Sequence, residues 1–398
     1  MRYICLVILF GQLMLMAQSQ PLYDSVENKI QNIHQNESWI LFARKMLSVS
    51  ASSLNQVSIV HLGDSHIQGG YFTNIMRTLC SQQFGTSSRG WVFPYDLAHS
   101  NGPEDITFRS NGHWMGIKYN HNLPSEHTCI SGYALNNTDS IINFSITLKN
   151  ESRIQFPFTT IAIYHNDSLL SLTCENNPQI TTRKIETALF ITTIKYNELH
   201  DSMQLKFQTH IRVPQSFRLT GINLQNDHAA LTYHAIGING MAYSMYDKYI
   251  EYLPVLGTLH PDCVIFSLGT NDAYMQLHDT ILFKRQLRSL VDNIRKINPS
   301  CCIILTTAGD HLRNKTLTNP SLLKVNAAII ATANEKNCAY WDFFKVMGGL
   351  GSTKNWHKHG LIYRDFIHLS KEGYKLQGKL FFEALNKAIT ESQTHGMD

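Results

Sequence analysis

The sequence is poor in charge and lacks the patterns typical of nucleic-acid binding. Only 16% of its 398 residues are charged, and the formal net charge is +4. No run of lysine and arginine stands out, and basic residues are not interleaved with aromatic ones. Binding to a phosphate backbone depends on clustered cations, so nucleic acid is not an expected partner. With 43% hydrophobic residues, the composition predicts a globular protein with a substantial core.

Patterns that hold metals and nucleotides are also missing. There is no His-Glu-x-x-His, no paired Cys-x-x-Cys and no carboxylate cluster at ligand spacing, so no metal is implied. A phosphate loop and a dinucleotide fingerprint are absent too, so no cofactor is expected. Eight cysteines occur, and setting aside Cys5 in the N-terminal apolar run leaves seven, an odd number that cannot all pair within one chain. Cys263, Cys301 and Cys302 lie in apolar runs and are predicted to be buried thiols, so a disulfide framework is not expected.

The N-terminus has the layout of a secretory signal peptide. Arg2 precedes an apolar run over 3–16, and the small residues Ala17 and Ser19 follow it. The run is short for a membrane span and is followed by Pro21, although an uncleaved anchor is the alternative. We expect residues 1–20 to be removed on export, which leaves a periplasmic or secreted protein without a membrane span.

Two kinds of pattern divide the rest of the chain. Before residue 100 and after residue 230, apolar runs alternate with helical patterns, which predicts a parallel sheet covered by helices in a three-layer α/β/α arrangement. The predicted strands are 57–63, 231–238, 263–268, 301–307 and 339–344, and the predicted helices are 25–50 (as one or two helices), 72–84, 242–256, 280–297, 321–336 and 370–392.

The middle of the chain has β-character only. Short β-branched or alternating runs, separated by Asn, Asp, Ser and Pro, predict an all-β sandwich or jelly roll. These runs are 141–148, 159–164, 189–196, 203–211 and 216–224. Because the strands on either side must join one sheet, we interpret 101–230 as a module inserted into an α/β domain made of 21–100 and 231–398. The module could bind sugar or gate substrate, or it could be a structural lid.

One serine stands where open α/β sheets bind ligands. The apolar run that begins at Val57 ends at Gly63, and Asp64 and Ser65 follow, beyond the carboxyl end of the predicted strand. A serine hydroxyl becomes a nucleophile only beside a base that is oriented by a third group. Near the C-terminus, Asp365 precedes His368 by three residues and supplies such a pair. Taken alone, the pair would be read as ordinary loop residues.

Two further segments end apolar runs with hydrogen-bond donors. They are Gly237-Ile-Asn-Gly240 and Gly269-Thr-Asn271-Asp272. A tetrahedral oxyanion needs backbone N–H groups or side-chain amides, and we assign this role to the Ser65 N–H, the Gly240 N–H and the Asn271 amide. Gly237 is the alternative to Gly240, which is preferred because it lies nearer a predicted helix start, where N–H groups are free. Asn271 also fits an ordinary turn after a strand.

These four segments, in this order, resemble the conserved blocks of the SGNH hydrolases, also called the GDSL esterase family. The resemblance implies a flavodoxin-like fold, Ser65 as nucleophile, His368 as base oriented by Asp365, and Gly240 and Asn271 as oxyanion donors. The long gap between the first two blocks is similar to that in the peptidoglycan O-acetylesterases of Gram-negative bacteria. Those enzymes carry a carbohydrate-binding-like β module at this place.

The resemblance therefore implies an exported serine esterase that removes O-acetyl groups from a glycan, with peptidoglycan as the expected substrate. An O-acetyltransferase working through the same acyl-Ser65, or an acetylesterase of xylan-type polysaccharides, is the alternative within enzymes. A catalytically silent glycan-binding protein is the alternative from another class. The presence of Ser65, Asp365 and His368 together argues against it.

Overall fold

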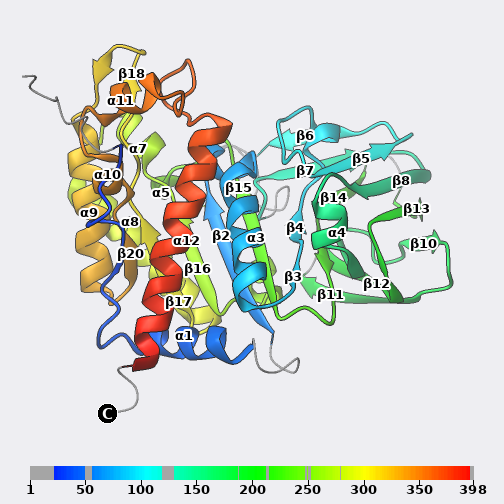
Figure 1. Cartoon of the computed structure of the whole chain (residues 1–398). Coiled ribbons are helices and arrows are strands. Elements are labelled where there is room, and N and C mark those ends of the chain that lie inside the picture. Colours follow the sequence, from blue (N-terminus) through cyan, green and yellow to red (C-terminus); the bar gives the residue numbers. More distant parts are fainter. Residues whose placement is uncertain are drawn as a thin grey trace, which may run out of the picture.

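The computed structural model describes residues 22–49, 56–118, 130–186, 188–211, 215–246, 249, 252–277 and 279–394. The predicted signal peptide, together with Cys5 and Cys129, lies outside the described residues. An α/β/α unit and a β-rich module lie side by side, with the module at the right in Figure 1. The N-terminal and C-terminal parts of the chain both belong to the α/β/α unit.

The central sheet is parallel except at one edge. Its order is β1-β20-β17-β16-β2-β15-β3, and only β1 runs antiparallel to its neighbour. All five predicted strands are present in it, which confirms the predicted fold class. The strands are β1 (Ile30–Gln31), β20 (Ala339–Trp341), β17 (Cys302–Thr306), β16 (Cys263–Ser267), β2 (Val57–Gly63), β15 (Leu231–Gly237) and β3 (Ser87–Ser88).

Helices cover both faces of this sheet. On one face, which includes Val57 and Ile59 of β2, the core contains side chains of α1 (Glu37–Val49), α3 (Tyr71–Phe84), α10 (Phe343–Met347), α11 (Ser352–Lys358) and α12 (Lys371–Thr394). On the other, Val60 and Leu62 share a core with α5 (Tyr243–Tyr246), α6 (Leu253–Thr258), α7 (Thr270–Tyr274), α8 (Thr280–Ile297) and α9 (Ser321–Glu335). Alternate residues of one strand therefore face opposite layers, as burial on both faces requires.

Two predicted helical segments are wrong in part. Of the predicted segment 25–50, the structure describes residues 25–49, and only α1 is helical there, because Asn32 and Gln35 have positive φ angles of 57° and 58°, which a right-handed helix excludes. Buried Ile30 belongs instead to the edge strand β1. Among the described residues of 242–256 there are two short helices, α5 and α6, and Pro254 lies in the first turn of α6, where proline starts a helix rather than continues one.

The inserted region forms two antiparallel sheets around one core, as predicted. One sheet has the order β10-β13-β8-β5 and the other β11-β12-β9-β14-β7-β6. Inward side chains of both sheets form a single hydrophobic cluster. The strands are β5 (Ile106–Ser110), β6 (Met115–Lys118), β7 (Tyr133–Asn137), β8 (Ile141–Leu148), β9 (Phe158–His165), β10 (Ser171–Cys174), β11 (Gln179–Glu186), β12 (Leu189–His200), β13 (Ser202–Gln208) and β14 (Phe217–Gln225), with a short helix α4 (Ser152–Gln155).

The module and the α/β/α unit share hydrogen bonds and core. The short strand β4 (Gly90–Val92) precedes the predicted boundary at residue 101, yet it pairs with β14 of the module. Trp91, Tyr164 and Ile191 belong to the same hydrophobic cluster as α8 and α9. The Tyr164 hydroxyl also lies 2.8 Å from the hydroxyl of Thr258. The exact domain boundaries stay a prediction, but the junction between the two parts is packed.

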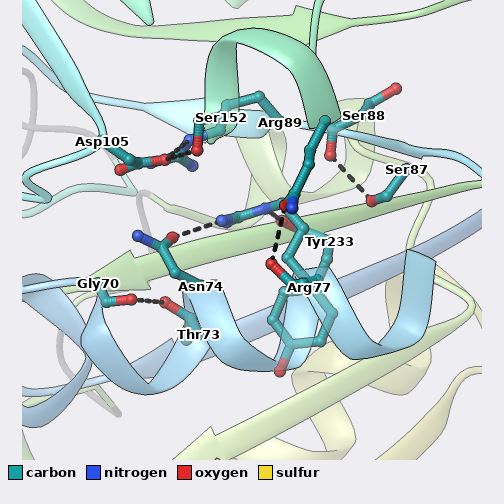
Figure 2. A network of polar contacts seen from close by, with 12 residues as sticks. Gly70, Thr73, Asn74, Arg77, Ser87, Ser88, Arg89, Asp105, Ser152 and Tyr233 are labelled. Carbon is teal, nitrogen blue, oxygen red and sulfur yellow. Dashed lines mark hydrogen bonds and ion pairs between the residues drawn. The ribbon is translucent and has the colours of Figure 1, made fainter. Parts of the chain in front are cut away.

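A buried polar network reinforces this junction (Figure 2). Arg89 donates two hydrogen bonds to Asp105, at 2.7 and 2.9 Å, and the Ser152 hydroxyl donates to the same carboxylate at 3.0 Å. Beside them, Arg77 of α3 donates to the Tyr233 carbonyl at 3.2 Å. Both arginine side chains are almost completely buried. The network thus connects α3 and β15 of the α/β/α unit with the first residues and the short helix of the module.

Candidate active site

The strand β2 passes directly into the short helix α2 (Ser65–Gln68). Asp64 caps this helix, because its carboxylate accepts the His66 N–H at 2.9 Å. Ser65 is therefore the first helical residue, placed at the carboxyl end of a parallel strand. N–H groups in the first turn of a helix have no intrahelical acceptor, so the Ser65 N–H is available to a bound anion.

The structure brings Ser65, His368 and Asp365 into one line of hydrogen bonds. Ser65 Oγ lies 2.9 Å from His368 Nε2, and His368 Nδ1 lies 2.6 Å from Asp365 Oδ2. The other oxygen of Asp365 accepts the N–H groups of Ile367 and His368, each at 2.9 Å. This geometry lets an imidazole remove the serine proton while a carboxylate fixes its tautomer.

The environment keeps Asp365 ionised. Burial alone would raise the pKa of this carboxyl group, but hydrogen bonds from the His368 ring and from two backbone N–H groups outweigh burial. The net result is a pKa below the usual range. Asp365 can therefore orient the ring and stabilise its protonated form across the neutral pH range.

The two glycines of Gly237-Ile-Asn-Gly240 have different surroundings. Gly237 packs against α2, and a Cβ added there would lie 2.1 Å from the backbone nitrogen of Gln68. Gly240 is exposed, has a φ of 79°, and a Cβ there would meet nothing within 4 Å. Gly237 is thus a packing position, whereas Gly240 lies in an open turn. This difference favours the Gly240 N–H as the oxyanion donor.

The side chain of Asn271 lies between the other two donor segments. It extends from α7, and its Nδ2 donates to the Met241 carbonyl at 2.9 Å and to Asp64 Oδ2 at 3.3 Å. Met241 follows Gly240 and Asp64 precedes Ser65, so all three proposed donors belong to one corner of the structure. Their catalytic roles stay predictions, and the geometry gives them a common location.

Two buried carboxyl groups lie behind this corner. Burial raises the pKa of Asp64 to about 7 and that of Asp272 to about 6. Asp272 accepts the backbone N–H groups of Tyr243 and Ser244, at 3.1 and 3.4 Å, and so caps α5. Its contacts are structural, whereas Asp64 contacts both the helix of Ser65 and the amide of Asn271.

A small cavity of about 30 Å³ lies close by in the chain, because its lining includes His66, Thr270 and Ile367, the chain neighbours of Ser65, Asn271 and His368. Ser65, Asp365, His368, Gly240 and Asn271 themselves do not line it. The cavity therefore does not define the space that an acyl group would occupy.

Sequence reasoning did not assign a role to the residues that surround the nucleophile helix. His66 Nδ1 lies 2.9 Å from the Tyr374 hydroxyl, and its ring centroid lies 5.1 Å from that of His368. Burial holds the pKa of His66 well below its usual value, so this ring is neutral. Gln68 and Asn239, which contact each other, were not identified either. No motif marks these residues, because their partners come from distant segments.

The described residues contain no group of three or more His, Cys, Asp or Glu side chains arranged to hold a metal ion. Among the same residues, no helix combines the length and the apolar character that a membrane crossing requires.

Comparison with known proteins identifies the α/β part of the chain. The model of the GDSL-like Lipase/Acylhydrolase family matches residues 217–376, which include Gly240, Asn271, Asp365 and His368. The chain carries a GDSL-like acylhydrolase domain. The match to this domain supports an esterase, and the matched residues do not include Ser65. A search of the curated proteins gave no match.

A solved structure shows the same fold. A peptidoglycan O-acetylesterase structure superposes on the GDSL-like chain with a TM-score of 0.71 and 21% identity, over 88% of this chain and 96% of that one. The likeness includes the β module as well as the esterase domain, because it extends over most of both chains. An acetyl xylan esterase and an acetylxylan esterase from Geobacillus stearothermophilus cover only 39% of this chain, with TM-scores of 0.32 and 0.31 and 20% identity each.

Proposed function

We propose that the protein is a serine esterase that removes O-acetyl groups from a glycan, with O-acetylated peptidoglycan as its substrate. The observation that carries the proposal is the distance of 2.9 Å between Ser65 Oγ and His368 Nε2, continued by 2.6 Å between His368 Nδ1 and Asp365 Oδ2. Two segments 303 residues apart meet at hydrogen-bond distance, in the order that acyl transfer to serine needs.

The proposed reaction has two steps. In the first, Ser65 Oγ attacks the acetyl carbonyl, and its proton passes to His368 Nε2. The tetrahedral oxyanion accepts hydrogen bonds from the Ser65 N–H, the Gly240 N–H and the Asn271 amide. Collapse of this intermediate breaks the ester bond, and the sugar hydroxyl leaves with the proton from His368. In the second step, His368 activates a water that hydrolyses the acetyl-Ser65 ester and restores the serine.

Support for the glycan comes from the likeness to the peptidoglycan O-acetylesterase, which has the same two-part architecture over nearly its whole length. The predicted signal peptide supports export to the compartment where peptidoglycan lies. We propose a periplasmic location on this basis. Xylan-type polysaccharides and transfer of the acetyl group to a sugar acceptor are the competing outcomes of the tests below.

The catalytic proposal is tested by acetate release from p-nitrophenyl acetate and from O-acetylated peptidoglycan. We expect wild type to release acetate from both substrates and Ser65→Ala to release none from either. Ser81→Ala, on α3, is the control and should have wild-type activity. Retention of activity by a folded Ser65→Ala protein would refute the serine mechanism.

The substrate and the location need separate measurements. O-acetylated xylan supplied in parallel should be hydrolysed much more slowly than peptidoglycan, and the reverse order would exclude peptidoglycan as the substrate. Adding a chitooligosaccharide should leave acetate release unchanged, whereas its acetylation would identify a transferase. Fractionation and mass spectrometry should find a periplasmic protein that lacks about the first 20 residues. A cytoplasmic full-length protein would contradict the proposed export.

A further inference from the structure

Gln68 ends the helix of the nucleophile, and every polar atom of its side chain has a partner. Its Oε1 accepts the N–H of Asn239 at 2.7 Å. Its Nε2 donates to the Asn101 carbonyl at 2.7 Å and to the Ser100 hydroxyl at 3.1 Å. A backbone N–H only donates and a backbone carbonyl only accepts, so the orientation of this amide is fixed. The residue is also almost completely buried, with an exposed fraction of 2%.

The three partners belong to two different parts of the chain. Asn239 immediately precedes Gly240, the proposed oxyanion donor. Ser100 and Asn101 lie at the entry to the β module. We propose that Gln68 is a positioning residue, which fixes the Gly240 N–H relative to Ser65 and which takes its own orientation from the entry to the module. This inference rests on the proposed function, because it assumes that Gly240 donates to the oxyanion.

A second set of contacts joins the same segments. The Asn239 side chain donates from Nδ2 to Asn101 Oδ1 at 2.6 Å. At the other end of the turn, the Tyr95 hydroxyl donates to the Gly237 carbonyl at 2.9 Å. The Ser100 hydroxyl lies 3.2 Å from the Tyr133 hydroxyl of β7, which anchors it within the module. The oxyanion turn is thus held at both ends by residues 95–101.

The turn has a backbone hydrogen bond of its own, from the Met241 N–H to the Ile238 carbonyl at 2.9 Å, but Gly240 makes few contacts. It is exposed, and its surroundings leave open space on the side where a Cβ would lie. Only the Cα and the carbonyl carbon of Asn239 lie between its backbone nitrogen and that of Gly240, so we expect that release of the first displaces the second. An oxyanion donor displaced by about 1 Å loses much of its effect, since rates fall up to about 100-fold for errors of this size.

The test replaces Gln68 by methionine, which has a similar length and no amide. Counting active sites with a sulfonyl fluoride allows turnover to be expressed per reactive Ser65, which removes the contribution of misfolded protein. We expect kcat for p-nitrophenyl acetate to fall about 10- to 100-fold, with KM changed less than about 3-fold. The inhibition constant of a boronic acid, which mimics the tetrahedral intermediate, should rise by a similar factor.

Gln286→Met is the matched control. Gln286 is another buried glutamine, exposed by 8%, but it lies on α8 away from Ser65. Its replacement should leave kcat per titrated site and boronic acid affinity at the wild-type values. A merely structural role for Gln68 would lower the melting temperature and the fraction of titratable sites without changing either of these two values.

Asn101→Ala tests the same contacts from the β module. It replaces Gln68→Met as the test if that variant does not fold. It removes Asn101 Oδ1, which accepts from Asn239 Nδ2 at 2.6 Å and from Gln68 Nε2 at 3.5 Å, and it keeps the carbonyl to which Gln68 donates at 2.7 Å. We expect a loss of kcat of about 2- to 10-fold, smaller than that of Gln68→Met. The two substitutions together should cost less than the product of their separate effects, because both act on one turn.

The outcomes separate this inference from the proposed function. Wild-type kcat per site in a folded Gln68→Met protein would overturn the positioning role, while inactive Ser65→Ala would leave the esterase proposal intact. A change confined to KM for the glycan would also overturn it and would assign Gln68 and Asn101 to sugar binding. Activity in Ser65→Ala would refute the esterase mechanism itself.

Discussion

Asn271, the proposed oxyanion donor, is held by hydrogen bonds from its side-chain amide in the free protein. In the structure its Nδ2 already has two acceptors, the Met241 carbonyl at 2.9 Å and Asp64 Oδ2 at 3.3 Å. The longer of these bonds is the weaker one, so it is the one that a bound oxyanion would replace. The amide is thereby held in place before substrate arrives, and little reorganisation is needed during the reaction.

Replacing this amide tests its proposed role. We expect Asn271→Ala to lower kcat by about 100- to 1,000-fold, because one oxyanion donor is lost. Steady-state kinetics with p-nitrophenyl acetate measures the effect, and circular dichroism checks that the variant is folded. A loss of less than about 5-fold would show that Asn271 only shapes the turn after β16.

Asp64 predicts a pH dependence of stability. Its folded-state pKa of about 7 lies above its ordinary value of 3.8, so from about pH 4 to pH 7 the folded protein holds a proton that the unfolded chain lacks. This group therefore makes stability fall as pH rises through that window. Asparagine keeps a capping oxygen but has no proton to lose. The melting temperature of Asp64→Asn relative to wild type should rise between pH 5 and pH 8, and a constant difference would contradict the raised pKa.

Among individual residues, the sequence predicted those whose side-chain chemistry is recognisable. Ser65, Asp365 and His368 stand in a motif, and each has a reactive group. Gln68 was missed because glutamine has no reactivity of its own. Its significance depends on Asn239 and Asn101, and only the folded chain brings those residues to it.

Among the elements, β15 and the turn that follows it lie closest to the helix of Ser65. The Gly237 backbone approaches that of Gln68 so closely that no side chain fits between them. This contact sets the height of α2 above the sheet and therefore the position of Ser65. Gly240 has a different constraint, since its positive φ of 79° costs a residue other than glycine roughly 1–2 kcal/mol but causes no clash.

The two glycines should therefore respond differently to alanine. Gly237→Ala should displace α2, lower the melting temperature and abolish activity. Gly240→Ala keeps its backbone N–H and should fold, with activity reduced by about 10-fold or less because the turn is strained. Thermal unfolding and kinetics on the pair provide the comparison. If Gly237→Ala were active and Gly240→Ala were not, the close packing described here would be wrong.

Sequence patterns predicted the long elements better than the short ones. Helix α8 runs from Thr280 to Ile297, as expected, because an apolar stripe continues through it and Asp279 caps it. The segment before α1 failed because apolar spacing does not report backbone conformation. Asn32 and Gln35 adopt left-handed angles there, and buried Ile30, which precedes them, pairs with Trp341 of β20.

At the scale of the whole molecule, the junction of Figure 2 depends on one buried carboxylate. Burial would raise the pKa of Asp105, but the cations of Arg89 and Arg77 lower it to about 2. Asp105 therefore contributes stability above its unfolded pKa, and the contribution is lost as pH falls through about 2. Without it, Arg89 would be a buried cation with no carboxylate beside it.

We expect Asp105→Asn to destabilise the protein by about 3–5 kcal/mol, measured by urea unfolding. Arg89→Met combined with Asp105→Leu should recover most of this loss, since apolar side chains leave no charge unpaired. The exposed pair Arg153 and Asp201 is the control, and Asp201→Asn should cost less than about 1 kcal/mol. If both aspartate substitutions changed the free energy of unfolding equally, burial of the Arg89–Asp105 pair would not increase its contribution to stability.

The topology of the central sheet has a consequence for how the chain acquires its structure during synthesis. Strand β2 is flanked by β15 and β16, whose residues follow it by about 170 and 200 positions. Strand β2 therefore stays unpaired during synthesis until the ribosome has released the whole module, whose own strands can pair as they emerge. An exported chain kept unfolded until it crosses the membrane would avoid this delay, because both partners of β2 would then be present from the start.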